Sequence, residues 1–332
     1  MTVTLDLLRR VPMFDDLQDA ELTEILGCFT EMPVEAGDHL YLEGEAASSA
    51  CFLIDGGLEA FKALPGGGET LVGTLLPGAM IGEMALLTGG ERTATVRARC
   101  PSTVIKVSHY FFHAALDQMS GPAFKILRAA VHAMTKRLVE LQSRILEQWD
   151  CGAYIASSAS RSVADATSLP PSFEYRPFLS VMPCFESFSE SDIDSVLTRG
   201  DVIEIPRGEF LYREGATPNA CYLILRGAIE RSVVRDRRYQ LSVLGPGHLC
   251  GANTMIAQEP RFCDARVRSQ ALLLRIDQPG FDTLFQGSGT ECLKFQNLVG
   301  ADQLMQLKAT DNLLALLVSQ SYVLSEPRGR SL

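Results

Sequence analysis

The sequence predicts a mainly β protein with flanking helices, built from two similar antiparallel domains in tandem, each followed by a long helix. The length of 332 residues is about twice that of a usual single domain. Runs of alternating apolar residues are separated by glycine turns roughly every ten residues, which is typical of short strands in a sandwich or barrel. The third observation is that this whole pattern occurs twice.

The repeat is visible in individual residues. Matched positions keep nearly the same separation along the chain, from the pair Gly37 and Gly208 to the pair Gly82 and Gly251. A register kept for so long indicates a duplication. We therefore expect a first domain at 1–150, a Ser/Ala-rich linker at 151–177, a second domain at 178–322 and a tail at 323–332. Other matched segments are Val11–Phe14 with Met182–Phe185, Glu43-Gly44 with Glu214-Gly215, and Cys51–Ile54 with Cys221–Ile224.

The composition argues against several classes of function. The chain has 30 Lys and Arg against 40 Asp and Glu, a net charge of −10, and an acidic chain without a basic run binds nucleic acids poorly. The nine cysteines are scattered singly, which predicts a reducing cytoplasm and no metal site. No apolar stretch approaches the roughly 18 residues of a membrane-spanning helix, and no secretory signal or catalytic motif is visible. We expect a soluble, cytoplasmic, non-enzymatic protein without a membrane or nucleic-acid partner.

The most specific motif is the segment Gly82–Val96, GEMALLTGGERTATV. A helical turn that opens after Gly82 directs several backbone N–H groups at one point, which favours an anion. Arg92 adds a planar, permanently charged group suited to phosphate, whereas Glu83 can accept a hydrogen bond from a sugar hydroxyl. The motif therefore indicates a nucleotide whose phosphate and ribose lie close together. The alternative, a surface salt bridge between Glu83 and Arg92, leaves the surrounding glycines unexplained.

This motif resembles the phosphate-binding cassette of cyclic nucleotide-binding domains, in the pattern G-E-x-A-L-L-x-x-x-x-R-T-A-T-V. Gly44, Gly57 and the Pro77-Gly78 turn fit the same family, and the resemblance covers nearly all of both repeats. It implies two cyclic-nucleotide-binding β-rolls of the double-stranded β-helix, or jelly-roll, type. It also implies that Glu83 holds the ribose 2′-hydroxyl and Arg92 the cyclic phosphate. The other ligand-binding residues implied are Gly82, Met84, Ala85, Thr93 and Ala94.

The resemblance does not decide the base. A hydroxyl such as that of Thr93 resembles sites preferring cyclic GMP in the kinase branch, and accompanies cyclic AMP in the bacterial activator branch. We favour cyclic AMP over cyclic GMP as the ligand.

The matching loop of the second repeat is degenerate. It starts at Gly251, and Ala252 stands where the first repeat has its carboxylate. Aligning Ala265-Arg266-Val267 with Ala94-Thr95-Val96 places Cys263 opposite Arg92, whereas counting forward from Gly251 places Arg261 there. The loop is either a former site kept as a structural module, or a pocket for a different ligand with Asn253 and an arginine as its polar groups.

A long helix is expected after the first roll, at Gly121–Trp149. Its apolar residues alternate in steps of three and four from Phe124 to Ile145, which is a heptad seam. The seam predicts a partner helix, either in a homodimer or, as a pseudo-dimer within one chain, at Glu291–Ser319. Packing on the roll itself is the alternative. By resemblance to the bacterial activator, Gln142 is a candidate base contact.

These features predict a cyclic nucleotide receptor that acts as a regulatory adaptor and switches an unknown effector protein. We find neither a catalytic set nor room for a DNA-binding domain. The alternatives are a constitutive scaffold or dimerisation module with relic sites, and a receptor for another second messenger such as cyclic di-GMP. The predicted architecture is common to all three.

Overall fold

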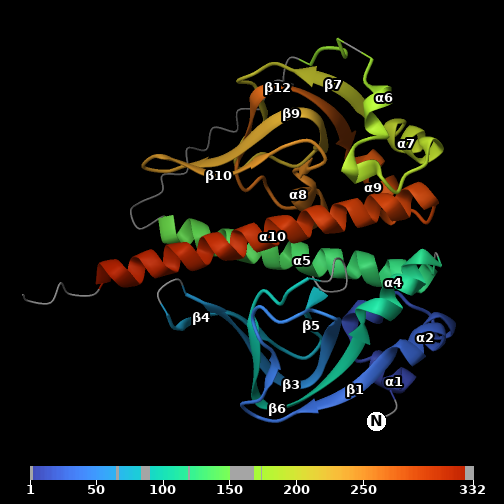
Figure 1. The fold of residues 1–332 in the computed structure, drawn as a ribbon, viewed down its shortest axis with the longest axis vertical. Helices are drawn as coiled ribbons and strands as arrows, with labels where there is room; N and C mark the ends of the chain where they lie inside the picture. The colour runs from blue at the N-terminus through green and yellow to red at the C-terminus, as the bar shows by residue number, and fades with distance from the viewer. Residues whose placement is uncertain are drawn as a thin grey trace, which may run out of the picture. The chain divides into compact units, whose positions relative to one another are not determined.

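The computed structural model describes residues 3–64, 67–83, 90–118, 120–149, 168–172 and 174–325. The chain forms two compact units, residues Met1–Gln148 with Leu304–Leu332, and residues Trp149–Gln303. Each unit contains one six-stranded antiparallel sheet with helices around it (Figure 1). The prediction of a mainly β protein with two repeated rolls is confirmed. Most of the predicted linker lies outside the described residues, and the predicted domain boundaries stay a prediction.

The first roll is built around two long strands that pair along most of their length, β3 and β6. Around them the sheet runs in the order β1-β6-β3-β4, with β2 on β6 and β5 on β3. The strands are β1 (Phe29–Val34), β2 (His39–Tyr41), β3 (Ser49–Ala63), β4 (Glu69–Leu75), β5 (Met80–Ile81) and β6 (Thr95–Ser108). The helices are α1 (Leu5–Leu8), α2 (Asp19–Ile25), α4 (His109–Asp117) and α5 (Gly121–Trp149).

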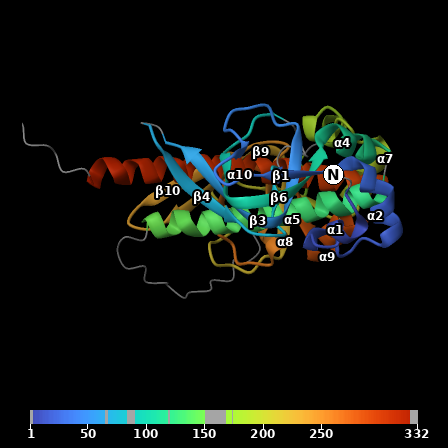
Figure 2. The same ribbon diagram turned by 90° about the horizontal axis from the view of Figure 1, so that it is seen from below.

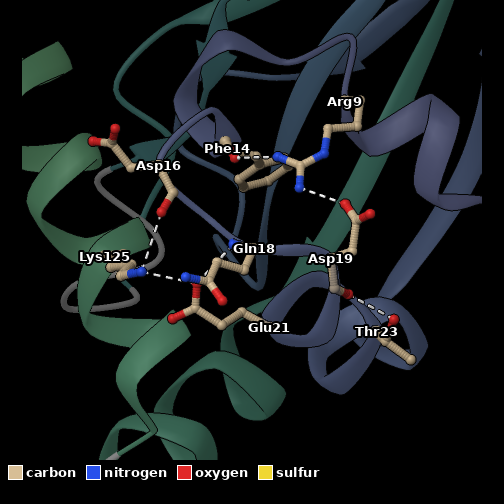
Figure 3. Close-up of polar contacts among 8 residues, drawn as sticks. All are labelled: Arg9, Phe14, Asp16, Gln18, Asp19, Glu21, Thr23 and Lys125. Atoms are coloured by element: carbon tan, nitrogen blue, oxygen red, sulfur yellow. Dashed lines mark hydrogen bonds and ion pairs between the residues drawn. The ribbon is translucent and has the colours of Figure 1, made fainter.

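Polar contacts attach the N-terminal helices to the start of α5 (Figure 3). Lys125 Nζ donates to a Glu21 carboxylate oxygen at 2.8 Å and to the Asp16 carbonyl at 3.1 Å. This ion pair lowers the pKa of Glu21, together with the hydrogen bond from the Gln18 backbone. The start of α5 therefore contacts α2 and the segment that precedes it.

The second roll repeats the topology, with the order β10-β9-β12-β7, β8 on β12 and β11 on β9. Its strands are β7 (Asp201–Ile205), β8 (Phe210–Tyr212), β9 (Ala220–Val234), β10 (Arg238–Leu244), β11 (Leu249–Cys250) and β12 (Asp264–Asp277). Its helices are α6 (Arg176–Leu179), α7 (Glu190–Leu197), α8 (Ala252–Ala257), α9 (Gln278–Gln286) and the first part of α10 (Thr290–Ser325).

Strand pairing defines which residues of the two rolls are equivalent. Gly56 and Gly227 adopt positive φ angles of 96° and 93° at the same bend of β3 and β9. Counted back from this bend, Cys51 corresponds to Tyr222, and the predicted match of Cys51 with Cys221 is wrong by one residue. The loop after β3 has five residues (64–68) and the loop after β9 has three (235–237), so matched positions beyond these loops lie closer together in the sequence.

The heptad seam of α5 is buried within the chain. The C-terminal part of α10, from Leu304, belongs to the same unit as α5 and lies beside it (Figures 1 and 2). Arg137 Nη2 of α5 lies 3.7 Å from an oxygen of Asp311 on α10. α5 and the C-terminal part of α10 therefore lie side by side within one chain, as the pseudo-dimer alternative expects. The buried seam residues are Phe124, Leu127, Val131, Met134, Leu138, Leu141 and Ile145.

Candidate functional site

The predicted phosphate loop borders a hollow on the inner face of the first roll. Gly82, Glu83, Arg92, Thr93 and Ala94 all line it, as the sequence predicts for a single site. The remaining wall is largely apolar, with residues from each of the strands β2 to β6. The predicted contacts Met84 and Ala85 lie outside the described residues.

Two backbone hydrogen bonds position Arg92 just before the start of β6. Its N–H donates to the Glu45 carbonyl at 2.8 Å, and its carbonyl accepts from the Gly44 N–H at 2.9 Å. The guanidinium carbon lies 3.3 Å from the centroid of the Tyr41 ring, and Nη2 donates to Ser49 Oγ at 3.3 Å. The residue is only 7 % exposed, yet among the described residues Nε and Nη1 have no hydrogen-bond partner. Buried donors left in this state favour an anion beside them.

Gly82 permits the loop to approach this guanidinium. Its φ is +75°, which is unfavourable for residues with a side chain. A Cβ at this position would lie 2.5 Å from Arg92 Nη1 and 3.2 Å from the Ser49 carbonyl. Both the backbone conformation and the space therefore require glycine.

Glu83 places a carboxyl group in the same hollow. It is 6 % exposed, and burial raises its pKa, while the nearby positive charge of Arg137 opposes that shift. When ionised, a carboxylate only accepts hydrogen bonds, so it suits a ligand hydroxyl. Arg92 thus brings to the hollow a cation with two donors that have no partner among the described residues, and Glu83 brings an acceptor.

Arg137 of α5 also lines the hollow, and sequence reasoning missed it. It lies beside the seam residue Leu138, and the heptad spacing gives no signal that it faces the roll. Gln142, the predicted base contact, is buried on the same helix but is not among the residues that line the hollow. Among the described residues of α5, Arg137 therefore lines the hollow. Gln142 lies more than one helical turn further along and does not.

In the second roll, Arg261 occupies the place of Arg92. Its N–H donates to the Ala216 carbonyl at 2.9 Å and its carbonyl accepts from the Gly215 N–H at 2.8 Å, as in the first roll. Its guanidinium carbon lies 4.2 Å from the centroid of the Tyr212 ring. The cation is therefore retained.

The predicted alignment of Cys263 with Arg92 is wrong. β6 begins at Thr95 and β12 begins at Asp264. The Thr95 side chain accepts a hydrogen bond from the Glu43 N–H at 3.0 Å, and the Asp264 side chain accepts one from the Glu214 N–H at 2.9 Å. Cys263 therefore corresponds to Ala94. No insertion separates the two loops, since Gly251 precedes Asp264 by as many positions as Gly82 precedes Thr95.

Arg261 differs from Arg92 in its hydrogen bonds. Nη1 donates to the Gly251 carbonyl at 2.8 Å and also to Thr254 Oγ1, and Nη2 donates to the Ala220 carbonyl. Ala252 begins α8 without a carboxylate, and the adjacent Asn253 is buried with no partner for its amide nitrogen among the described residues. The protein itself thus satisfies most of the guanidinium donors.

Fold and hollow together define a class: a protein of two repeated β-rolls, the first with a buried cation and a carboxyl group facing one hollow. The model of the cyclic nucleotide-binding domain matches residues 31–119 and 202–288, more than half of the chain. This chain belongs to the cyclic nucleotide-binding domain family, with one such domain in each roll.

Comparison with individual proteins gives similar relatives. The chain is 20 % identical over 280 residues to the cAMP-dependent protein kinase regulatory subunit of Emericella nidulans, covering 82 % of this chain and 56 % of that protein. It is 35 % identical over 113 residues to a cyclic nucleotide-gated potassium channel of Mesorhizobium japonicum, covering 34 % of this chain and 28 % of that protein. The solved regulatory domain of Toxoplasma gondii PKA with cAMP is 17 % identical, with a TM-score of 0.31 and coverage of 85 % of this chain and 91 % of that chain. The chain thus spans little more than half the length of the first relative.

Neither a membrane-spanning helix nor a metal-binding cluster occurs within the described ranges. No helix there is long and apolar enough to cross a membrane. No group of three or more His, Cys, Asp or Glu side chains there could hold a metal ion.

Proposed function

We propose that this chain is a receptor for a cyclic nucleotide, which binds in the first roll and regulates a partner protein. Arg92 would hold the cyclic phosphate and Glu83 the ribose 2′-hydroxyl. The observation that carries the proposal is the pair of buried Arg92 donors, Nε and Nη1, beside a hollow that Glu83 also lines. Thr93 and Ala94 would contact the ligand at the same wall.

Cyclic AMP is the ligand we favour over cyclic GMP, and a kinase-type effector is the partner class. The support comes from the relatives named cAMP-dependent protein kinase regulatory subunits, three of which match over more than four fifths of this chain. The activity proposed for this chain itself is non-catalytic.

The output of binding would pass through α5 and α10. Arg137 lines the hollow and lies near Asp311, so the negative charge of a ligand phosphate would change the electrostatic environment of this helix pair. A ligand shifts a conformational equilibrium only by its difference in affinity for the two states. The ligand would therefore favour the state in which the positions of α5 and α10 suit ligand binding.

Calorimetric titration of the full chain with cyclic AMP, cyclic GMP and cyclic di-GMP tests this proposal. We expect one tight site per chain for a cyclic mononucleotide. Saturation by cyclic di-GMP alone would assign a different second messenger. Absence of binding for all three nucleotides by a folded chain would leave the constitutive scaffold as the function.

A further inference from the structure

An arginine of the second roll takes the position of an alanine that lines the hollow of the first. Ala60 of β3 pairs with Val96 of β6, and Arg231 of β9 pairs with Ala265 of β12. Val96 is the second residue of β6 and Ala265 is the second residue of β12, and the first residues of these two strands are equivalent. Their partners Ala60 and Arg231 are therefore equivalent too. Ala60 lines the first hollow, and Arg231 is only 7 % exposed.

The surroundings of Arg231 are the counterparts of the hollow wall. Its guanidinium is hydrogen-bonded to Cys263 and lies near Tyr212 and Cys250. Strand pairing and the loop register relate each of these three residues to one in the first roll. The counterparts all line the first hollow: Tyr41, Ile81 and Ala94.

We propose that the Arg231 side chain fills the place of a ligand in the second roll and thereby closes that roll against cyclic nucleotides. A planar guanidinium on a three-carbon stem replaces one methyl group, and interiors are packed too closely to accommodate both the side chain and a nucleotide. Ala252 removes the carboxyl group as well, so the second roll lacks both the space and the sugar acceptor. The chain would then bind one cyclic nucleotide, in the first roll only.

This inference rests on the proposed function only in taking the first hollow as the ligand site, and a ligand-free experiment tests it separately. Cys263 is 2 % exposed and contacts Arg231. We would treat the folded full chain with methyl methanethiosulfonate and follow labelling of Cys263 by mass spectrometry. In Arg231→Ala, the vacated space should admit the reagent, and labelling should be at least about tenfold faster than in the wild type.

The matched control is Arg226→Ala, which removes an exposed arginine from the same strand, β9. Cys263 should stay protected in that variant, as it should in Arg231→Met, which keeps most of the side-chain volume. Continued protection of Cys263 in a folded Arg231→Ala protein would overturn the proposal. Equal labelling of Cys263 in the Arg226→Ala and Arg231→Ala proteins would do the same.

The reciprocal exchange covers the case in which Arg231→Ala does not fold. Ala60→Arg should abolish cyclic nucleotide binding to the first roll, with the cooperative thermal transition retained, because the second roll already accommodates an arginine there. Wild-type affinity in Ala60→Arg would refute the proposal. If the wild-type chain binds no cyclic nucleotide, the proposed function fails, and the labelling experiment still decides the role of Arg231.

Discussion

The Arg92 guanidinium is stacked on the Tyr41 ring, with 3.3 Å between the guanidinium carbon and the ring centroid. The Tyr41 hydroxyl is in turn within hydrogen-bonding distance of Cys51 Sγ, at 3.0 Å. The second roll repeats this relationship between Arg261 and Tyr212. The ring thus supports an arginine that has few protein hydrogen bonds of its own.

The first prediction concerns this ring. Tyr41→Leu should weaken cyclic nucleotide binding about 2- to 30-fold, because a cation–π contact contributes about 0.5–2 kcal/mol. Tyr41→Phe keeps the ring and should stay within about threefold of the wild type. Calorimetric titration of both variants measures the difference. Equal losses in Leu and Phe variants would mean that the hydroxyl, rather than the ring face, positions Arg92.

The second prediction concerns Gly82. Gly82→Ala should weaken ligand binding at least about tenfold, since the new Cβ would displace Arg92 Nη1. Gly37→Ala is the matched control, because Gly37 also has a positive φ, of +89°, but no atom within 4 Å of an added Cβ. The two variants should have comparable backbone strain, and only Gly82→Ala should alter affinity by more than about threefold. Similar affinities for the two proteins would contradict the close approach of loop and guanidinium.

A third prediction follows from the buried carboxyl group of Glu83. Burial raises its pKa above the ordinary value of 4.5. Since the ionised form accepts from the ribose, affinity should fall as the pH is lowered from about 7.5 to about 5. Glu83→Gln should bind about 5- to 30-fold more weakly at neutral pH, with little dependence on pH in that range. Titrations at several pH values provide the comparison, and a pH-dependence retained in Glu83→Gln would assign it to another group.

The fourth prediction concerns Asp311 on α10. Its pKa is raised from the ordinary value of 3.8, chiefly by burial, against the opposing charge of Arg137. The folded state therefore keeps this proton to higher pH than the unfolded state, and its contribution to stability is lost as the pH rises through the folded-state pKa. Relative to the wild type, Asp311→Asn should become more stable as the pH rises from about 4 to about 7. Urea unfolding across that range tests the sign, and a relative loss of stability at the higher pH would show that ion pairing with Arg137 outweighs burial.

Local sequence signals brought the described residues of the predicted first site around one hollow, because these residues lie in one loop. Glu83 and Arg92 are close in the sequence, and a motif with glycine at its start places them on one wall. Arg137 and Asp311 could not be identified in this way. Each lies on a long helix, and only the packing of α5 beside α10 determines which residue faces the roll.

The second loop shows how identical residues can mislead. Matching Ala265 and Val267 to Ala94 and Val96 shifted the alignment by two residues and displaced Arg261 from its true position. The cause is the shorter loop after β9, which changes the spacing between the repeats before the motif begins. In the sequence, Arg231 likewise resembles an ordinary charged residue of a strand. Its burial follows from the register of β9 against β12, which the sequence alone does not determine.

The role of Arg92 as the phosphate-binding group is tested by comparing Arg92→Leu with Arg97→Leu in calorimetric titrations with cyclic AMP and cyclic GMP. Arg92 lies just before β6 and Arg97 lies within it. Arg97 forms an ion pair with Glu69 and stacks on Phe61 instead of lining the hollow. Arg92→Leu should bind at least about a hundredfold more weakly, a loss of about 2.7 kcal/mol, while Arg97→Leu should stay within about threefold of the wild type. Unchanged affinity in Arg92→Leu would contradict the account.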